Sequence, residues 1–158
     1  CIKKIKIKRK IQKKVNDIVK HEENIFEIKI ERGCVSGTKK VLKKQGDKIC
    51  GKTQDIVVEI VQKSHKYFER KGDDICHILV LSLKEALIGF CFKIINVDGK
   101  EIIHKTRRIT KPNHIYRISQ RGMFNERESN IGDFLLICKV NFPREFTEQQ
   151  RDVLEKIL

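Results

Sequence analysis

The chain has 158 residues, of which 39% are hydrophobic and 35% are charged, and this composition excludes a disordered tail. No apolar run approaches the roughly 18 residues that a membrane-spanning helix needs, so we expect a soluble protein without a membrane partner. The isolated cysteines described next indicate a cytoplasmic compartment. The formal net charge of +14 favours an acidic partner, although Lys and Ile are frequent throughout the sequence and weaken that inference.

Six cysteines are scattered along the chain, at positions 1, 34, 50, 76, 91 and 138. They form no CxxC pair, and no histidine stands at zinc-finger spacing. We therefore expect reduced, mostly buried thiols rather than a metal site. The sequence opens at Cys1 directly in a strand-like pattern, so we expect it to be a piece of a longer protein.

The chain begins with a predicted strand over residues 1–11, where Ile5 and Ile7 alternate with lysines. This is the period of a half-buried strand, with one apolar face and one row of ammonium groups. Residues 12–24 are polar and charged, so we expect a surface loop there.

A second strand is predicted over residues 25–33, and it carries its apolar side chains on one face: Phe26, Ile28 and Ile30. Turns are expected at Gly33 and at the Ser36-Gly37 pair. Residues 55–61, DIVVEIV, are rich in β-branched side chains and predict a central strand of a sheet.

Residues 65–90 form the predicted boundary between two small β domains. A charged KGDD turn lies between two apolar runs, and a short helix follows. Ser82 is placed to cap this helix, Glu85 to complete a capping box and Gly89 to end the helix. The segment therefore ends one β region and begins another.

The second half of the chain repeats the order of parts in the first half. An Asp-Gly pair at 98–99 predicts a hairpin. Further on, Ile118 and Gly122 stand about 76 residues after Leu42 and Gly46 in a similar pattern. A period of that length indicates a duplicated domain.

The chain ends in a predicted helix that begins with a capping box of Thr147 and Gln150. Its apolar residues form a stripe at helical spacing: Val153, Leu154, Ile157 and Leu158. A helix this short is marginal alone, so the stripe must pack on another surface. Packing on its own domain and packing on a second subunit are equally compatible with the sequence.

Motifs for catalysis or metal binding are absent from the sequence. It contains no GxSxG elbow, no phosphate-binding loop and no GxGxxG fingerprint, and its five histidines are not paired at metal-ligand spacing. The carboxylates of Asp73 and Asp74 are expected to serve the KGDD turn. We therefore predict no catalytic residue, no metal, no cofactor and no enzymatic activity.

The lysine row of the first strand allows three interpretations. It is a solvated surface, a contact for nucleic-acid phosphates, or a contact for an acidic peptide that also uses Ile5 and Ile7 as an apolar floor. Aromatic residues make up only 6% of the chain, and no run of Phe and Tyr is suited to stacking bases. The alternation therefore favours a peptide over a nucleic acid.

Five stretches resemble the C-terminal peptide-binding region of DnaJ-type co-chaperones, the heat-shock 40-kilodalton family: IKIERGCVSGTKKVLKKQGD, DIVVEIVQKSHKYFERKGDDICHILVLSLKEALIGF, NVDGK, QRGM and GDFLLICKVNFPREFTEQQRDVLEKIL. They cover essentially the whole chain in the family's order, and the second is highly specific. The sequence has no His-Pro-Asp tripeptide of a J domain and no cysteine-rich zinc module. The resemblance is therefore to the zinc-free type II, or class B, members.

The resemblance implies a mainly β fold of two tandem β-sandwich-like subdomains of similar topology, with short helices and a C-terminal dimerisation helix. We accordingly divide the chain into C-terminal subdomain I with the peptide-binding groove (1–74), subdomain II (75–145) and the dimerisation helix (146–158). The stripe of the terminal helix would then join two copies into a homodimer.

In this family a shallow groove on the first subdomain receives hydrophobic segments of unfolded client proteins. It also receives the acidic Glu-Glu-Val-Asp tail of a DnaK-class 70-kDa heat-shock chaperone. By position, the resemblance implies an apolar floor and a set of cations: Ile5, Ile7 and Phe68, with Lys3, Lys4 and Lys6. Relatives often have a larger side chain where Ile5 stands, so the depth of the pocket differs here. Phe92 and Ile94 would be the counterparts in the second subdomain.

The predicted function is that of a co-chaperone fragment that binds unfolded polypeptides and the chaperone tail during protein folding. Two alternatives belong to other classes. The net charge suggests a basic nucleic-acid-binding module, and the terminal helix suggests a plain dimerisation scaffold.

Overall fold

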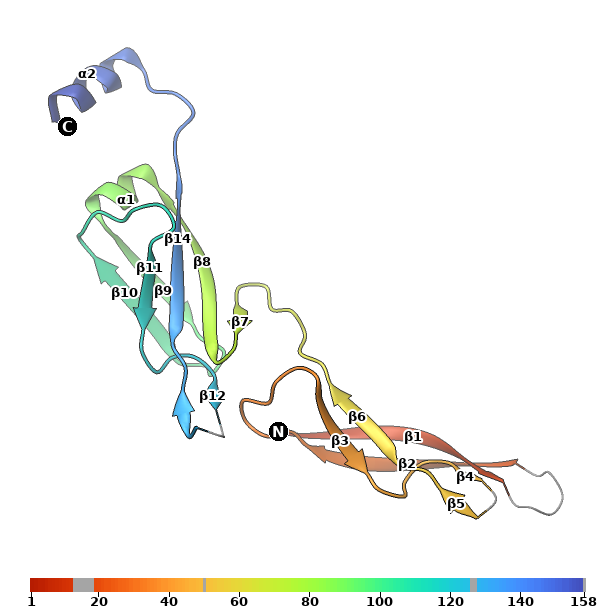
Figure 1. Cartoon of the computed structure of the whole chain (residues 1–158). Helices are drawn as coiled ribbons and strands as arrows, with labels where there is room; N and C mark the ends of the chain where they lie inside the picture. The colour runs from red at the N-terminus through yellow and green to blue at the C-terminus, as the bar shows by residue number, and fades with distance from the viewer. Residues whose placement is uncertain (13–18, 50, 126–127, 158) are drawn as a thin grey trace. The chain divides into compact units, whose positions relative to one another are not determined.

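The computed structural model describes residues 1–12, 19–49, 51–125 and 128–157 (Figure 1). It confirms the predicted class, a mainly β protein with short helices. The strands are β1 (Ile2–Gln12), β2 (Val19–Lys29), β3 (Thr38–Leu42), β4 (Lys48–Ile49), β5 (Lys52–Thr53), β6 (Ile56–Ile60), β7 (Glu69–Lys71), β8 (Asp74–Ser82), β9 (Phe90–Ile95), β10 (Glu101–Thr106), β11 (Ile115–Ile118), β12 (Phe124–Asn125), β13 (Asn130–Ile131) and β14 (Phe134–Asn141). The helices are α1 (Leu83–Ile88) and α2 (Glu148–Ile157).

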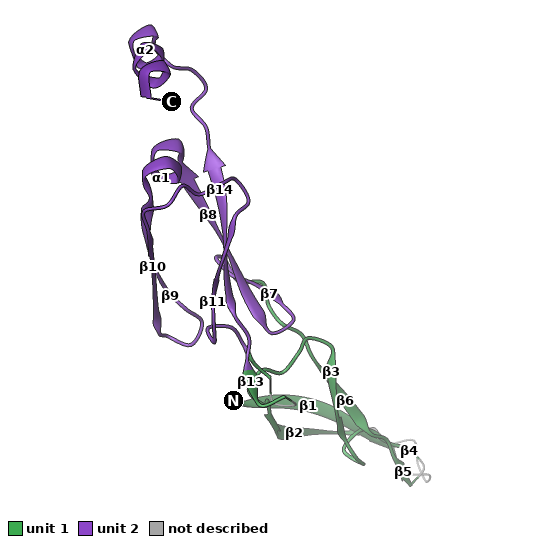
Figure 2. Ribbon diagram, turned by 60° about the vertical axis from the view of Figure 1, so that its left-hand side comes forward, with its two compact units in different colours: residues 1–64, 124–130 green, residues 65–123, 131–158 purple. Residues whose placement is uncertain are grey.

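The chain divides into two compact units, which have separate colours in Figure 2. Unit 1 comprises residues 1–64 and 124–130, and unit 2 comprises residues 65–123 and 131–158. No helix in the described part of the chain is long and apolar enough to cross a membrane.

Unit 1 is built around the long antiparallel pair of β1 and β2, whose register runs from Ile2 opposite Lys29 to Gln12 opposite Val19. The predicted first strand is confirmed. The predicted loop over residues 12–24 is wrong for residues 19–24, which belong to β2, while residues 13–18 lie outside the described residues. The polar side chains of residues 19–24 are compatible with a strand because acidic ones pair with basic ones across the hairpin.

The strand over DIVVEIV is confirmed as β6, but its predicted central position is wrong. Among the described residues β6 pairs only with β3, in a two-stranded sheet. Val57 is 57% exposed and Val61 is 73% exposed. β-branched residues indicate extended backbone, but they do not specify how many neighbours a strand has.

Unit 2 has a four-stranded sheet in the order β11-β14-β8-β7 and a two-stranded sheet of β10 and β9. β14 lies between β11, to which it is antiparallel, and β8, to which it is parallel (Figure 1). Side chains from both sheets form one hydrophobic core: Ile75, Leu81, Phe90, Phe92, Ile102, Phe134, Leu136 and Cys138.

The predicted helix of the boundary segment is confirmed as α1, with its complete capping box. The Glu85 N–H donates to Ser82 Oγ over 3.2 Å, and the Ser82 N–H donates to Glu85 Oε2 over 2.8 Å. Ser82 Oγ also donates to Glu85 Oε2 over 2.7 Å, and the two hydrogen bonds that Ser82 donates to this carboxylate lower the pKa of Glu85. Gly89 ends the helix at a φ of 107°, where a side chain would be strained.

The KGDD turn is also confirmed, because Gly72 and Asp73 connect β7 to β8. Asp74 Oδ1 accepts the N–H of Asp133 over 2.7 Å, and the Ile75 N–H donates to the Asp133 carbonyl over 2.9 Å. These bonds fix the start of β8 beside the start of β14.

The predicted internal repeat is confirmed by matching hydrogen bonds in the two units. With an offset of 76 to 78 residues, three hydrogen bonds recur. Two join backbone groups: Gly37 N–H to Ile60 O matches Asn113 N–H to Cys138 O, and Gly46 N–H to Gln54 O matches Gly122 N–H to Gly132 O. In the third, a backbone N–H donates to an aspartate side chain: Lys44 N–H to Asp55 Oδ1 matches Gln120 N–H to Asp133 Oδ1. Lys44 and Gln120 also share a left-handed backbone, with φ of 55° and 57°. The β3–β6 pair of unit 1 is therefore the counterpart of the β11–β14 pair of unit 2.

The prediction of mostly buried cysteines is wrong for the described residues. Only Cys76 and Cys138 are buried, and burial raises the pKa of both thiols. Cys1 and Cys91 are exposed, and Cys34 is half-buried. None of these five described cysteines forms a disulfide, and Cys50 lies outside the described residues.

Candidate functional site

Among the described residues, one edge of β1 has no partner strand over most of its length. β2 occupies one side of the whole strand, whereas on the other side β4 contacts only Ile11 and Gln12. The Lys10 N–H points to this second side, where it donates to Asp47 Oδ1 over 2.7 Å. Backbone groups alternate along a strand. The open edge of β1 is thus formed by the N–H and C=O groups of alternate residues: Ile2, Lys4, Lys6 and Lys8.

The two faces of β1 differ in chemistry beside this edge. Ile5 and Ile7 are half-buried on one face, where Ile5 is directly opposite Phe26 of β2. Lys4 and Lys6 are exposed on the other face. By the same alternation, Lys3 belongs to the face of the two isoleucines and is exposed. The structure therefore places Lys3 with the apolar floor and the other two predicted cations on the opposite face.

Carboxylates of β2 pair with the lysines of the polar face. Lys4 Nζ lies 3.1 Å from Glu27 Oε1. Glu23 contacts both Lys6 and Lys8, and these two ammonium groups lower the pKa of its carboxyl. An acidic ligand on this face would exchange partners with Glu23 and Glu27 rather than meet unpaired lysines.

Phe68, the remaining predicted floor residue, belongs to unit 2. Its ring stacks on His65, with 4.9 Å between ring centroids, and meets Phe134 edge-on at 6.0 Å. It packs against the core of unit 2 and lines a shallow hollow of about 260 Å³ together with His77 and Tyr67. The structure thus groups five of the six predicted groove residues on β1 and gives Phe68 a packing role in unit 2.

The two residues predicted as second-subdomain counterparts also pack in unit 2. Phe92 is buried in the hydrophobic core, and Ile94 is half-buried against it. Phe92 is therefore more deeply buried than the half-buried Ile5 and Ile7, whereas Ile94 is half-buried as they are.

The terminal helix α2 begins at the predicted capping box, where the Gln150 N–H donates to Thr147 Oγ1 over 3.3 Å and the Thr147 N–H donates to Gln150 Oε1 over 3.0 Å. None of its described residues is buried. Val153 is 54% exposed and Ile157 is 73% exposed, while Leu158 lies outside the described residues. Two of the three described residues of the predicted stripe are therefore exposed.

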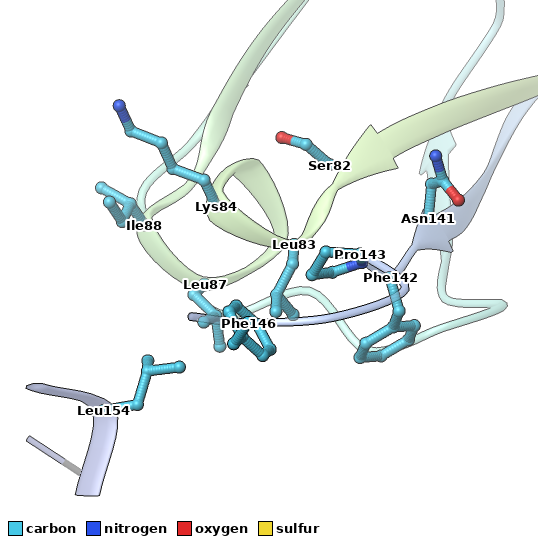
Figure 3. A pocket seen from close by; sticks show the side chains of 10 residues that line it. All are labelled: Ser82, Leu83, Lys84, Leu87, Ile88, Asn141, Phe142, Pro143, Phe146 and Leu154. Atoms are coloured by element: carbon cyan, nitrogen blue, oxygen red, sulfur yellow. The ribbon is translucent and has the colours of Figure 1, made fainter. Parts of the chain in front are cut away.

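An apolar pocket of about 550 Å³ lies between α1 and the C-terminal segment (Figure 3). Leu154, the half-buried member of the stripe, points into it from α2, and Phe146 lies beside Leu83 and Leu87 of α1 (Figure 3). Phe142 and Pro143 complete the apolar wall.

The sequence matches the family described as DnaJ C terminal domain over residues 1–143. The chain belongs to this family. The resemblance inferred from the sequence motifs is therefore confirmed, and it extends across both units of the structure.

Several curated DnaJ homologues align with nearly the whole chain. Protein psi1 of Schizosaccharomyces pombe is 38% identical over 157 residues, which are 98% of this chain and 41% of psi1. Human DnaJ homolog subfamily B member 5 is 33% identical over 158 residues, 99% of this chain and 45% of that protein. DnaJ homolog shv of Drosophila melanogaster is 33% identical over 141 residues, 87% of this chain and 40% of that protein. The chain spans less than half the length of each of these relatives.

Sequence reasoning missed the apolar pocket of this DnaJ C-terminal domain. Phe142 continues the alternation of the strand DFLLICKVNF that the sequence predicts, so it was interpreted as part of that strand, whereas Phe146 belongs neither to this alternation nor to the stripe of the terminal helix. A large apolar residue outside any periodic element, Phe146, was the available signal.

One buried polar group of unit 2 has no partner. The ring of His104 contacts the rings of Phe90 and Tyr116, which also contact each other, and its Nε2 makes no hydrogen bond within the described structure. Burial lowers its pKa. The described residues contain no group of three or more His, Cys, Asp or Glu placed to hold a metal ion.

Proposed function

We propose that the chain is the client-binding region of a cytoplasmic, non-enzymatic co-chaperone, which binds unfolded polypeptides and the acidic tail of a DnaK-class chaperone during protein folding. The observation that carries the proposal is the open edge of β1, with an isoleucine face on one side and a lysine face on the other. Membership of the DnaJ C-terminal domain family supports it.

A bound peptide would add a strand to the open edge of β1. The backbone groups of Lys4, Lys6 and Lys8 would pair with those of the peptide without demanding a sequence, as in β-augmentation. Alternate peptide side chains would contact the face of Ile5 and Ile7, and an apolar side chain fully removed from water contributes roughly 1.5–3 kcal/mol. Such binding is weak and general, which suits a protein that holds many clients.

The lysines of β1 would also increase the affinity for the acidic tail. Lys3 has no carboxylate partner among the described residues, so it is available on the apolar face. Lys4 and Lys6 would exchange their contacts with Glu27 and Glu23 for contacts with the tail. The same ion pairs reduce the attraction of this face for nucleic-acid phosphates, which disfavours the alternative of a nucleic-acid-binding module.

Fluorescence titration with a labelled peptide that ends in Glu-Glu-Val-Asp tests the peptide site. Ile7→Asp places a negative charge on the floor, and we expect it to weaken binding at least ten-fold. The matched control is Ile103→Asp on β10, which adds the same charge at an exposed position of unit 2. Unchanged affinity in Ile7→Asp would remove β1 as the site.

We further propose the functional division of the chain into a peptide-binding subdomain (1–74), a second subdomain (75–145) and a dimerisation helix (146–158). The exposed stripe of α2 supports the last assignment, because Val153 and Ile157 lack a cover among the described residues. We expect Val153→Asp combined with Ile157→Asp to convert a homodimer into monomers. Sedimentation velocity measures this, and Glu155→Gln on the same helix is the control. A mass unaffected by the double substitution would contradict the role of α2.

A further inference from the structure

The loop that follows β10, over residues 107–111, lies beside α1 at one end of unit 2 (Figure 1). Two contacts hold it there. A side chain on Gly89, at the end of α1, would collide with the backbone of Arg107. Three residues further on, the Thr110 N–H donates to the Ala86 carbonyl over 2.8 Å. The residues between these two contacts therefore run along the C-terminal end of the helix.

This junction buries small side chains and exposes large apolar ones. Ala86 is 3% exposed and Thr110 is 2% exposed, because both face the interior of unit 2. Ile88 of α1 is 65% exposed, and Ile109 of the loop is 68% exposed. Two isoleucines thus protrude from neighbouring segments, and the rest of the described chain leaves most of their surface in contact with water.

Cations surround the two isoleucines. Lys84 stands four residues before Ile88, and the two side chains lie next to each other on α1, where both also line the apolar pocket (Figure 3). Arg107, Arg108 and Lys111 are exposed on the loop. None of these four cations has a carboxylate partner among the described residues, because the ion pairs of unit 2 join other side chains.

Acidic residues are scarce around this junction. Residues 102–125 contain none. Glu85 is the single acidic residue of α1, and its carboxylate is hydrogen-bonded to Ser82 at the start of the helix. The four cations and this one carboxylate give a local net charge of about +3. We call this surface the basic end of unit 2, and it consists of Lys84, Ile88, Arg107, Arg108, Ile109 and Lys111.

We propose that the basic end of unit 2 binds the surface of a lipid bilayer that contains anionic phospholipids. The two isoleucines would enter the boundary between headgroups and acyl chains, while the lysines and arginines would contact the anionic headgroups. Aliphatic protrusions favour a bilayer over a nucleic acid, whose bases stack on aromatic side chains. Surface binding needs no spanning helix, and the expectation of no membrane partner rested only on the lack of such a helix. It is also independent of peptide binding at β1.

Flotation of the 158-residue chain with lipid vesicles tests this proposal. We expect binding to phosphatidylcholine vesicles that contain about one-quarter phosphatidylserine, at about 0.1 M salt, and no binding to phosphatidylcholine alone. Each Lys or Arg beside an anionic surface raises the partition coefficient about five-fold, so Arg107→Gln combined with Arg108→Gln should lower it about 25-fold. Ile88→Ser combined with Ile109→Ser should lower it at least ten-fold because less apolar surface leaves water.

Matched controls make the same kinds of change elsewhere. Lys39→Gln combined with Lys43→Gln removes two exposed charges from unit 1. Ile95→Ser combined with Val97→Ser removes two exposed apolar side chains, 67% and 48% exposed, at the end of β9 that is remote from α1. We expect both controls to bind the anionic vesicles within about two-fold of the unchanged chain.

A second measurement locates the contact directly. The chain contains no Trp, so Ile109→Trp introduces a single indole fluorophore. Its emission should shift to shorter wavelength when anionic vesicles are added, because the ring leaves water. Ile95→Trp should show no shift.

Three results would overturn the proposal. The first is no binding to the anionic vesicles. The second is an equal loss of binding in the arginine variant and in the Lys39 and Lys43 control, which would indicate a net-charge effect. The third is full binding by the isoleucine variant with no shift in Ile109→Trp, which would make the surface a site for a soluble polyanion such as a single-stranded oligonucleotide or polyglutamate. Peptide affinity at β1 is measured separately, so failure here is distinguishable from failure of the proposed function.

Discussion

Neutralising Glu23 is expected to strengthen the binding of the acidic tail peptide. The polar face beside the open edge of β1 carries Lys4, Lys6 and Lys8 against Glu27 and Glu23, a local net charge of about +1. Glu23→Gln raises this to about +2 and releases both lysines that the carboxylate now contacts. Because exposed charges interact weakly, we expect affinity to rise about two- to five-fold at 0.05 M salt.

The assay is fluorescence titration with the peptide ending in Glu-Glu-Val-Asp, repeated at 1 M salt, where the Debye length of about 3 Å should abolish the gain. The control is Glu101→Gln, which changes the net charge equally but releases Lys93 in unit 2, where the two groups are 2.8 Å apart. Equal gains in both variants would indicate a net-charge effect. No gain in Glu23→Gln would refute the assignment of the lysine face to the tail.

Three further predictions concern stability, each measured by urea denaturation. Ile75→Ala should lower the free energy of unfolding by about 2–5 kcal/mol because the Ile75 side chain is fully buried. Ile60 is only half-buried, so Ile60→Ala should lower it by less than half as much in the 158-residue chain. Equal losses would show that unit 1 is as tightly packed as unit 2. Ser82→Ala should lower the free energy of unfolding by about 1 kcal/mol because α1 loses its N-cap, whereas Ser82→Thr should keep most of that stability. A loss as large in Ser82→Thr would indicate another role for this residue. Burial lowers the pKa of His104 below its unfolded value near 6.5, so the unfolded state binds more protons and stability should fall as pH decreases below about 6.5. His104→Phe should reduce that loss between pH 7.5 and 5.5, and an unchanged pH dependence would exclude His104 as its source.

Local rules predicted the parts of the fold that depend on a few adjacent residues. The capping boxes of α1 and α2 and the Asp-Gly hairpin turn require only short-range hydrogen bonds, and all formed as expected. The extent of β2 was missed because its acidic residues look like a loop until the facing lysines of β1 are known. Likewise, the composition of β6 indicates a strand, but whether that strand is central depends on which other segment reaches it.

The candidate site was predicted in part for the same reason. The alternation of Ile5 and Ile7 with lysines is a local property, and the structure retains it on β1. The ion pair between Lys6 and Glu23 depends on the register between β1 and β2. The contact of the Phe68 ring with Phe134 joins residues far apart in the chain. Neither was accessible from a pattern within one segment.

The pairing of β14 with β8 has a consequence for synthesis on the ribosome. Asp74 and Asp133, which join the starts of these strands, are 59 residues apart, and β14 is the last strand to leave the exit tunnel. Until it emerges, β8, β9 and β10 have no central strand to close their core, and Ile75, Leu81 and Phe92 stay exposed on the nascent chain. A region that we propose to bind unfolded clients therefore passes through a client-like state of its own during translation. A nascent chain that stops before residue 134 would remain in that state.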